Sequence, residues 1–262
     1  LIVAQSLTKL FVQKRSLIPS RRRYFTAVDD VSFDIRAGEV FGLVGESGSG
    51  KSTIARMIAA LYSLDGGAVH FDGEAVDRGS SATMLNSYRR QIQMIFQDPF
   101  SSLNPRMRVD AIIAEPLRHL SELSGDLVTR RGDALLEGVG LGSAAGSRFP
   151  HEFSGGQRQR ISVARALATR PRFLICDEPT SALDVSVQAQ ILNILKDLQE
   201  QLNLTMLFIS HDLPVVRQMC DRVGVLRSGK LVELADTETL FEAPQHAYTK
   251  ELLRLMPRFR TG

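Results

Sequence analysis

Residues 39–61, EVFGLVGESGSGKSTIARMIAAL, decide the fold. The apolar run from Val40 to Val44 predicts a strand. A loop of glycine and serine follows it, and apolar residues then recur at the spacing of a helix face, at Ile54, Met57, Ile58 and Leu61. The stretch therefore predicts one strand–loop–helix unit.

The loop GESGSGKST at residues 45–53 matches the pattern GxxxxGK[ST]. Glycines let the backbone fold tightly, so that N–H groups and the start of the helix can surround a β-phosphate. Lys51 is placed to neutralise β- and γ-phosphate oxygens, and Ser52 to bind Mg²⁺. The alternative is a mobile glycine loop, which the flanking strand and helix disfavour. The predicted nucleotide contacts are Gly45, Glu46, Ser47, Gly48, Ser49, Gly50, Lys51, Ser52 and Thr53.

Two further apolar runs predict strands buried in a sheet. RFLICDEP at residues 172–179 is almost continuously hydrophobic, as is TMLFIS at 205–210. Between them, residues 187–202 place apolar side chains on one helical stripe. These are Val187, Ile191, Ile194, Leu195, Leu198 and Leu202. The order strand, helix, strand predicts a parallel sheet with right-handed crossovers.

The remaining segments do not follow this alternation. Residues 62–97 contain short β-like pieces, which we interpret as a small antiparallel layer continuing into the core. Residues 105–170 are mostly helical in pattern and predict a subdomain inserted between core strands. Residues 223–235 predict two strands joined by a Ser-Gly turn, and residues 247–256 predict a terminal helix.

Two acidic residues follow the run FLIC. Asp177 ends a predicted buried strand, where a carboxylate is costly unless a charge meets it. A magnesium ion near Ser52 would do so through a bound water. Glu178 points elsewhere, toward a water in line with a γ-phosphate. A lone Asp-Glu pair is as often a structural acid, but the phosphate loop in the same chain favours the catalytic interpretation.

Two other polar residues follow predicted strands. His211 comes after FIS, at the edge where open α/β sheets bind ligands, and we expect it to contact the γ-phosphate. A lone histidine is more often structural. Gln97 comes after MIF and is placed to reach the metal and the water. Considered alone, it is a surface glutamine.

The stretch FSGGQRQRISVARAL at residues 153–167 predicts a second phosphate-binding element. A helix start presents unpaired N–H groups and the positive end of the dipole, and Ser154, Gly155 and Gly156 add a hydroxyl and unobstructed backbone. If the helical subdomain holds Ser154 away from Lys51, the two elements bind one nucleotide only when they come from different protomers.

Composition narrows the class of protein. The chain has 32 basic and 29 acidic residues, and this near balance gives no support for nucleic-acid binding. Its two cysteines, Cys176 and Cys220, cannot supply a disulfide framework or a four-cysteine metal site, so a reducing cytosol is expected. No apolar run approaches the about 18–20 residues of a bilayer span. Because the first residue is Leu1, we expect an excised domain or half of a longer polypeptide.

Taken together and in order, these motifs resemble the nucleotide-binding subunit of ABC transporters. The resemblance covers nearly the whole chain and rests on the phosphate loop, Gln97, FSGGQ at residues 153–157, LICDEP and SALD at residues 181–184, and His211. Phe153 stands where leucine is commoner in the family. The resemblance implies ATP and Mg²⁺ as cofactors. It adds Gln157 and Asp184 to the nucleotide contacts, and Phe11 as the aromatic under adenine, with Tyr24 and Phe25 as alternatives.

The resemblance also implies a fold and a domain division. The expected class is α/β, a P-loop (RecA-like), mostly parallel sheet core with an antiparallel β layer and an inserted α-helical subdomain. The ATP-binding core is expected at residues 1–98 and 169–235, and the helical signature subdomain at 99–168. A C-terminal extension is expected at residues 236–262.

Three segments narrow the subfamily. EAPQHAYTKELL (242–253), QDPFSSLNPRM (97–107) and EPTSALDVSVQAQIL (178–192) resemble ATPases of oligopeptide, dipeptide and nickel importers. Some of that group carry a cysteine-rich tail for an iron–sulfur cluster. This chain lacks those cysteines and therefore resembles the cluster-free partner, or half of a fused tandem ATPase.

The importer interpretation implies partners and a location. We expect a homodimer or a heterodimer with a second ATPase, membrane permeases docked on apolar anchors such as Leu103 and Met107, and an extracytoplasmic solute-binding protein in the complex. The chain would be a peripheral subunit at the cytoplasmic face of the inner membrane. The basic segment 14–23 is interpreted as a solvated loop, with anionic lipid as the alternative. A soluble ABC ATPase acting on ribosomes or DNA is the alternative function, and a module without turnover is disfavoured by Glu178 and His211.

Overall fold

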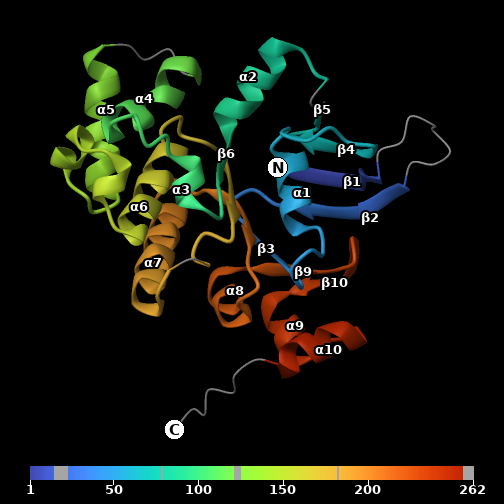
Figure 1. Ribbon diagram of the computed structural model, residues 1–262. Helices are drawn as coiled ribbons and strands as arrows, with labels where there is room; N and C mark the ends of the chain where they lie inside the picture. Colours follow the sequence, from blue (N-terminus) through green and yellow to red (C-terminus); the bar gives the residue numbers. More distant parts are fainter. Residues whose placement is uncertain (15–22, 78, 121–124, 182, 256–262) are drawn as a thin grey trace, which may run out of the picture. The chain divides into compact units, whose positions relative to one another are not determined.

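The computed structural model of the chain describes residues 1–14, 23–77, 79–120, 125–181 and 183–255 (Figure 1). The chain divides into two compact units. The first contains residues 1–80 and 207–262, and the second contains residues 81–206. Most of the basic segment at 14–23 lies outside the described residues. The domain limits expected from the sequence are finer than this division and stay a prediction.

The first unit contains an antiparallel sheet with strand order β2-β1-β4-β5 (Figure 1). Its strands are β1 (Ile2–Lys14), β2 (Arg23–Ile35), β4 (Gly66–Phe71) and β5 (Glu74–Val76). Along β1 the side chains of Ile2, Ala4 and Leu7 are buried. This sheet confirms the predicted antiparallel layer, although the sequence interpretation placed it in residues 62–97 and missed the two long strands at the start of the chain.

A second group of strands in the first unit carries the phosphate loop. β3 (Val40–Val44) pairs in parallel with β9 (Arg222–Arg227), and β10 (Lys230–Asp236) pairs antiparallel with β9. Helix α1 (Lys51–Ile58) follows the loop after β3, which confirms the predicted strand–loop–helix unit. The helix ends before Leu61, which is 40% exposed and does not belong to its buried face.

Three short helices complete the first unit. They are α8 (Leu213–Met219), α9 (Thr237–Glu242) and α10 (Ala247–Arg254), and Figure 1 shows α9 and α10 side by side after β10. The predicted pair of strands at 223–235 and the predicted terminal helix are both confirmed. The turn between β9 and β10 is made by Ser228 and Gly229, both with positive φ.

The second unit pairs two parallel strands with a group of helices. β6 (Ile92–Ile95) runs parallel to β7 (Phe173–Asp177), whose five residues are all buried. Helix α7 (Val185–Leu202) follows β7 and buries Ile191, Leu192 and Leu195, but leaves Leu202 at the end of the predicted stripe 53% exposed. The next strand, β8 (Thr205–Ile209), contains the boundary between the two units.

Residues 81–91 form a helix that the sequence interpretation missed. Helix α2 (Ala82–Gln91) begins after Ser81, whose side chain accepts a hydrogen bond from the N–H of Met84, and it buries Leu85 and Tyr88. A serine cap followed by apolar residues three apart is a helix signal. The interpretation of residues 62–97 as sheet alone is therefore wrong for this part.

The predicted helical subdomain is present within the second unit (Figure 1). Its elements are α3 (Pro99–Ser102), α4 (Val109–Leu120), α5 (Asp126–Gly138), the short 3₁₀ helices η2 (Ser143–Ser147) and η3 (Pro150–Glu152), and α6 (Gly155–Ala166). None of the helices in the described ranges has the long apolar stretch that a bilayer span requires.

The segment after Gln97 corrects one of the two expected docking anchors, while Met107 is half-buried and stays a prediction. Leu103 is only 2% exposed and belongs to the core of its unit, so it is not available to a partner. Phe100 in α3 is instead 64% exposed. The guanidinium carbon of Arg158 lies 3.8 Å from the centre of its ring, which orients the ring at the surface.

Candidate functional site

The phosphate loop passes so close to other backbone that two of its glycines accept no side chain. A Cβ at Gly45 would lie 2.1 Å from the carbonyl oxygen of Leu226, and one at Gly50 would lie 2.4 Å from that of Ala27. Both glycines also have positive φ, as has Gly48. The glycine pattern found in the sequence therefore follows from the close approach of β9 and β2.

Lys51 is held by the loop that it follows. Its side chain is buried, and its ammonium donates to the carbonyl oxygens of Gly45 at 2.8 Å and Glu46 at 2.9 Å. The cap residue of α1 is Gly50, which has no side chain that could cap the first turn. The helix start and the ammonium thus supply the donors and the positive charge that suit a phosphate.

Gln97 and Glu178 meet at the carboxyl ends of two parallel strands. Ile95 of β6 pairs with Cys176 of β7, so the residues two positions further on lie side by side. The Gln97 amide Nε2 donates to Glu178 Oε2 at 3.1 Å. The sequence predicted that both act at the nucleotide, but their direct contact was missed, because it depends on strand register.

The backbone at Glu178 is unusual. Its φ of 48° lies in the left-handed region, which non-glycine residues seldom adopt. The carbonyl oxygen of Glu178 accepts hydrogen bonds from the backbone N–H of Ser181 at 3.3 Å and from its hydroxyl at 3.2 Å. Such strained conformations persist where surrounding contacts fix them, and they gather at functional sites.

The two residues before Glu178 are deeply buried. Asp177 is 1% exposed at the end of β7, as expected for a carboxylate that needs a charged partner. Burial, and then the nearby charge of Asp177, raise the pKa of the Cys176 thiol to about 12. The thiol therefore stays protonated at neutral pH, which agrees with the prediction that Cys176 is a small buried hydrophobe.

The predicted second phosphate element starts α6. Ser154 caps the helix: its hydroxyl accepts from the N–H of Gln157 at 3.3 Å, and the Gln157 side chain accepts from the N–H of Ser154 at 3.0 Å. This capping box orders the start of the helix. Gly156 is buried, and a Cβ there would lie 2.2 Å from Cγ1 of Val187 on α7. Packing alone therefore requires glycine at 156, a reason the sequence did not reveal.

Asp184 and His211 stand next to helix starts. Asp184 caps α7, accepting from the N–H of Val187 at 2.9 Å and from the Ser186 hydroxyl at 2.8 Å. The Val187 bond first, and then the Ser186 bond, hold the pKa of Asp184 below its ordinary value. His211 is exposed and precedes Asp212, which caps α8.

Phe11 is a partly exposed aromatic residue on β1. The residue is 37% exposed, its backbone pairs with Phe25 across the sheet, and its ring meets Tyr62 edge to face at 5.7 Å. Tyr24 and Phe25 are more exposed still, at 53% and 52%. All three aromatics remain available, so the choice of Phe11 stays a prediction.

One contact at the phosphate loop was missed in the sequence. The hydroxyl of Tyr248 in α10 accepts a hydrogen bond from the N–H of Glu46 at 3.2 Å. The tail around Tyr248 was interpreted only as a mark of subfamily. No local pattern signals a contact between residues so far apart in the chain.

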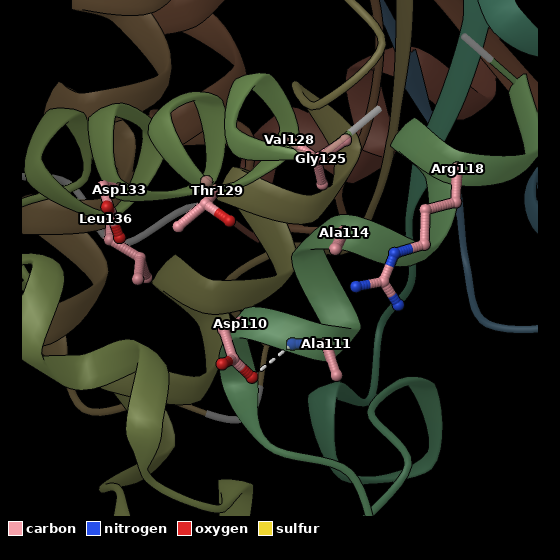
Figure 2. A pocket seen from close by; sticks show the side chains of 10 residues that line it. Asp110, Ala111, Ala114, Arg118, Gly125, Val128, Thr129, Asp133 and Leu136 are labelled. Atoms are coloured by element: carbon pink, nitrogen blue, oxygen red, sulfur yellow. Dashed lines mark hydrogen bonds between the residues drawn. The ribbon is translucent and has the colours of Figure 1, made fainter. Parts of the chain in front are cut away.

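A cavity of about 450 Å³ lies between α4 and α5, and no predicted site residue lines it. Figure 2 shows Arg118 reaching in from α4, and Thr129 and Asp133 from α5. It is lined by Asp110, Ala111, Ala114, Arg118, Gly125, Val128, Thr129, Gly132, Asp133 and Leu136. Among the residues that the structure describes, no group of three or more histidine, cysteine, aspartate or glutamate side chains could hold a metal ion.

Relatives and solved structures agree in their descriptions. The chain is 55% identical over 233 residues to the oligopeptide transport ATP-binding protein OppF of Bacillus subtilis (strain 168), covering 88% of this chain and 76% of that protein. It is 51% identical over 238 residues to the dipeptide transport ATP-binding protein DppF of Lactococcus lactis subsp. cremoris (strain MG1363), covering 88% and 75%.

A solved structure is also similar to this chain. It is described as an ATP-binding cassette in a dimeric post-hydrolysis state bound to ADP and Pi, and it matches with a TM-score of 0.79 at 28% identity. The match covers 90% of this chain and 99% of that one. The family model described as ABC transporter matches residues 28–181, which include the phosphate loop, the FSGGQ segment and the Asp177–Glu178 pair. This chain belongs to the ABC transporter family.

Proposed function

We propose that this chain is the ATP-hydrolysing subunit of an importer that takes up peptides or a related small solute. The relatives above carry the names of oligopeptide and dipeptide transport ATP-binding proteins. The hydrogen bond between Gln97 and Glu178 carries the catalytic part of the proposal, because it places a carboxylate and an orienting amide together beside the buried Asp177. An ATPase acting on ribosomes or DNA is not favoured by these relatives.

The chain's own residues divide the work on ATP. The phosphate loop and the start of α1 bind the β-phosphate, and the Lys51 ammonium, held by the carbonyl oxygens of Gly45 and Glu46, directs its positive charge at the β- and γ-phosphate oxygens. Ser52 offers a hydroxyl to Mg²⁺, and Gln97 offers an amide oxygen. Asp177 offers a carboxylate through a water. Oxygen ligands of these types suit Mg²⁺. When bound, the ion neutralises charge that develops on the phosphate oxygens.

Glu178 acts as the general base. Its carboxylate takes a proton from a water that attacks the γ-phosphorus, the bond from that phosphorus to the bridging oxygen breaks, and ADP and inorganic phosphate leave. Gln97 orients the carboxylate and the water, and His211 contacts the γ-phosphate. A water held in line by these groups needs little further reorganisation during the reaction.

The site is completed by a second ATPase copy, identical or different. The start of the partner's α6, with Ser154, Gly155, Gly156 and Gln157, then faces the γ-phosphate, and Asp184 lies in the same interface. The solved cassette that the chain resembles is described as dimeric with ADP and Pi, which supports this arrangement. Closure on ATP and opening after hydrolysis supply the motion.

The motion passes to membrane permeases through the segment after Gln97. Phe100 is the exposed apolar anchor there, in place of the buried Leu103. An exposed aromatic suits a shallow groove on a partner, with polar residues at its rim. In this arrangement the subunit is peripheral at the cytoplasmic face of the membrane, and an extracytoplasmic solute-binding protein delivers the solute.

The test is uptake in a strain that lacks this gene and any redundant importer. Labelled dipeptides, oligopeptides and nickel are supplied with wild type, Phe100→Ala or the control Leu127→Ala, whose side chain is 57% exposed on α5. We expect uptake by wild type and the control, and at least about tenfold less with Phe100→Ala, as for loss of an interface anchor. No uptake of any of these solutes by wild type would defeat the importer proposal while leaving the family assignment in place.

A further inference from the structure

The C-terminal helix α10 contacts the phosphate loop through one buried side chain. Tyr248 is 2% exposed, and its hydroxyl accepts the N–H of Glu46 at 3.2 Å. The tail that contains it distinguishes the subfamily in sequence, yet the ATPase chemistry described above gives it no role.

The peptide group that Tyr248 contacts also holds the loop lysine. The N–H of Glu46 and the carbonyl of Gly45 belong to one planar peptide unit. The carbonyl accepts from Lys51 Nζ at 2.8 Å, while the N–H donates to Tyr248. Because the unit is planar, the tyrosine hydroxyl fixes the direction in which the carbonyl meets the ammonium. Hydrogen bonds on the two sides of one peptide also polarise one another.

This peptide can turn if it is released. A turn of this peptide changes ψ of Gly45, and glycine has the widest backbone freedom. A turn of the peptide would break both the bond to Tyr248 and the bond to Lys51. The loop and its lysine would then sample conformations that do not suit a phosphate, which lowers affinity by the fraction of molecules in them.

The helix start that carries Tyr248 is itself tied to the strand β10. The carboxylate of Glu233 accepts the N–H groups of Gln245 at 2.7 Å and His246 at 3.0 Å, and His246 Nδ1 accepts the N–H of Tyr248 at 3.2 Å. The guanidinium carbon of Arg227 lies 4.7 Å from the centre of the Tyr248 ring. The hydroxyl is therefore held from several sides and aimed at the loop.

We propose that Tyr248 is a positioning residue for nucleotide binding, which holds the Gly45–Glu46 peptide and through it Lys51 in the phosphate-binding conformation. That the bound nucleotide is hydrolysed rests on the proposed function, whereas the contact of Tyr248 with the loop does not. It makes α10 a part of the nucleotide site, so that any partner or modification that displaces the tail helix lowers ATP affinity.

The first measurement is amide hydrogen exchange at Glu46 in the full chain without nucleotide. Tyr248→Phe keeps the ring and removes the acceptor, and we expect exchange at Glu46 to become at least about threefold faster. The control is Lys250→Ala, which changes an exposed side chain on the same helix and leaves the peptide contact in place. Its exchange at Glu46 should stay within about twofold of wild type. Unchanged exchange at Glu46 in Tyr248→Phe overturns the proposal.

The second measurement is the dependence of turnover on ATP. Loss of one hydrogen bond that prepares the loop should raise KM about two- to tenfold. The kcat should change by less than about twofold, because no group at the reacting phosphorus is altered. A lower kcat at unchanged KM, or the same change in Lys250→Ala, overturns the positioning role.

A second variant covers the case in which Tyr248→Phe does not fold. Glu233→Gln keeps the tyrosine and weakens the two bonds that tie down the start of α10, and it should also speed exchange at Glu46. Unchanged exchange there overturns the proposal. If the wild type binds no nucleotide, the proposed function fails, and the exchange measurement still decides the role of Tyr248.

Discussion

Gly156 offers a quantitative test of the packing between α6 and α7. In Gly156→Ala the new Cβ would lie 2.2 Å from Cγ1 of Val187, far inside the usual separation of carbon atoms of about 3.5–4.0 Å. Valine in a helix has one strongly preferred rotamer, so its methyl cannot easily turn away. Overpacking of this kind costs about 1–3 kcal/mol, and replacing glycine by alanine in a helix returns up to about 1 kcal/mol.

We therefore expect Gly156→Ala to lower the free energy of unfolding by about 1–2 kcal/mol, and the Tm by about 3–6 °C. The matched control is Gly155→Ala, whose Cβ would lie 3.5 Å from Cδ2 of Leu183, an ordinary contact. Its Tm should stay at or slightly above that of wild type. Thermal unfolding followed by circular dichroism measures both variants. Equal losses for the two alanines, or none for Gly156→Ala, would refute the packing argument.

The double variant Gly156→Ala with Val187→Ala separates packing from phosphate binding. Removing the valine methyls should recover about 1 kcal/mol relative to the sum of the single changes, because the two sites are in contact. If ATP turnover recovers together with the Tm, Gly156 serves packing. If the Tm recovers and turnover does not, its backbone is needed at the nucleotide, as the sequence predicts.

Three further sets of variants test the burial of Leu103, the capping by Asp184 and the sharing of the site between protomers. Leu103→Asp should lower stability by about 3 kcal/mol or more in thermal unfolding, because it buries a charge in the core, whereas a docking residue would leave the Tm unchanged. The folded-state pKa of Asp184 lies below its ordinary 3.8, so its capping contribution is present above about pH 4 and is lost as the pH falls through the folded pKa. Asp184→Asn should therefore be less stable than wild type at neutral pH and lose less stability on acidification, and equal pH profiles would contradict this. Mixed dimers of Lys51→Ala and Ser154→Arg chains should recover part of the ATPase activity that each variant lacks alone, and verified mixed dimers without recovery would contradict a site shared between protomers.

Local pattern accounts for what could be predicted from the sequence. The phosphate loop combines a strand, required glycines and a helix within residues 39–61, so one short window contained the whole signal. Helix α2 had a comparable signal in its serine cap, but the β-like pieces on either side dominated the interpretation. The strands β1 and β2 have register shifts that interrupt the alternation of buried and exposed residues, and this weakens the two-residue period that identifies a strand.

Contacts set by the fold could not be predicted. The bond between Gln97 and Glu178 depends on the pairing of Ile95 with Cys176, and sequence alone does not give strand register. Leu103 shares its segment with Phe100, and only packing decides which of the two is buried. The contact of Tyr248 with Glu46 joins residues from opposite ends of the chain.

Turnover by Glu178→Gln tests whether Glu178 is the general base. The new amide oxygen can still accept the hydrogen bond from Gln97, so the geometry is kept while the base is lost. In the assembled transporter we expect ATP turnover to fall by about 10²-fold or more, with ATP affinity within about threefold of wild type, and ATP to hold the two copies together as a dimer. Hydrolysis of ATP at the wild-type rate would contradict the assignment of Glu178 as the general base.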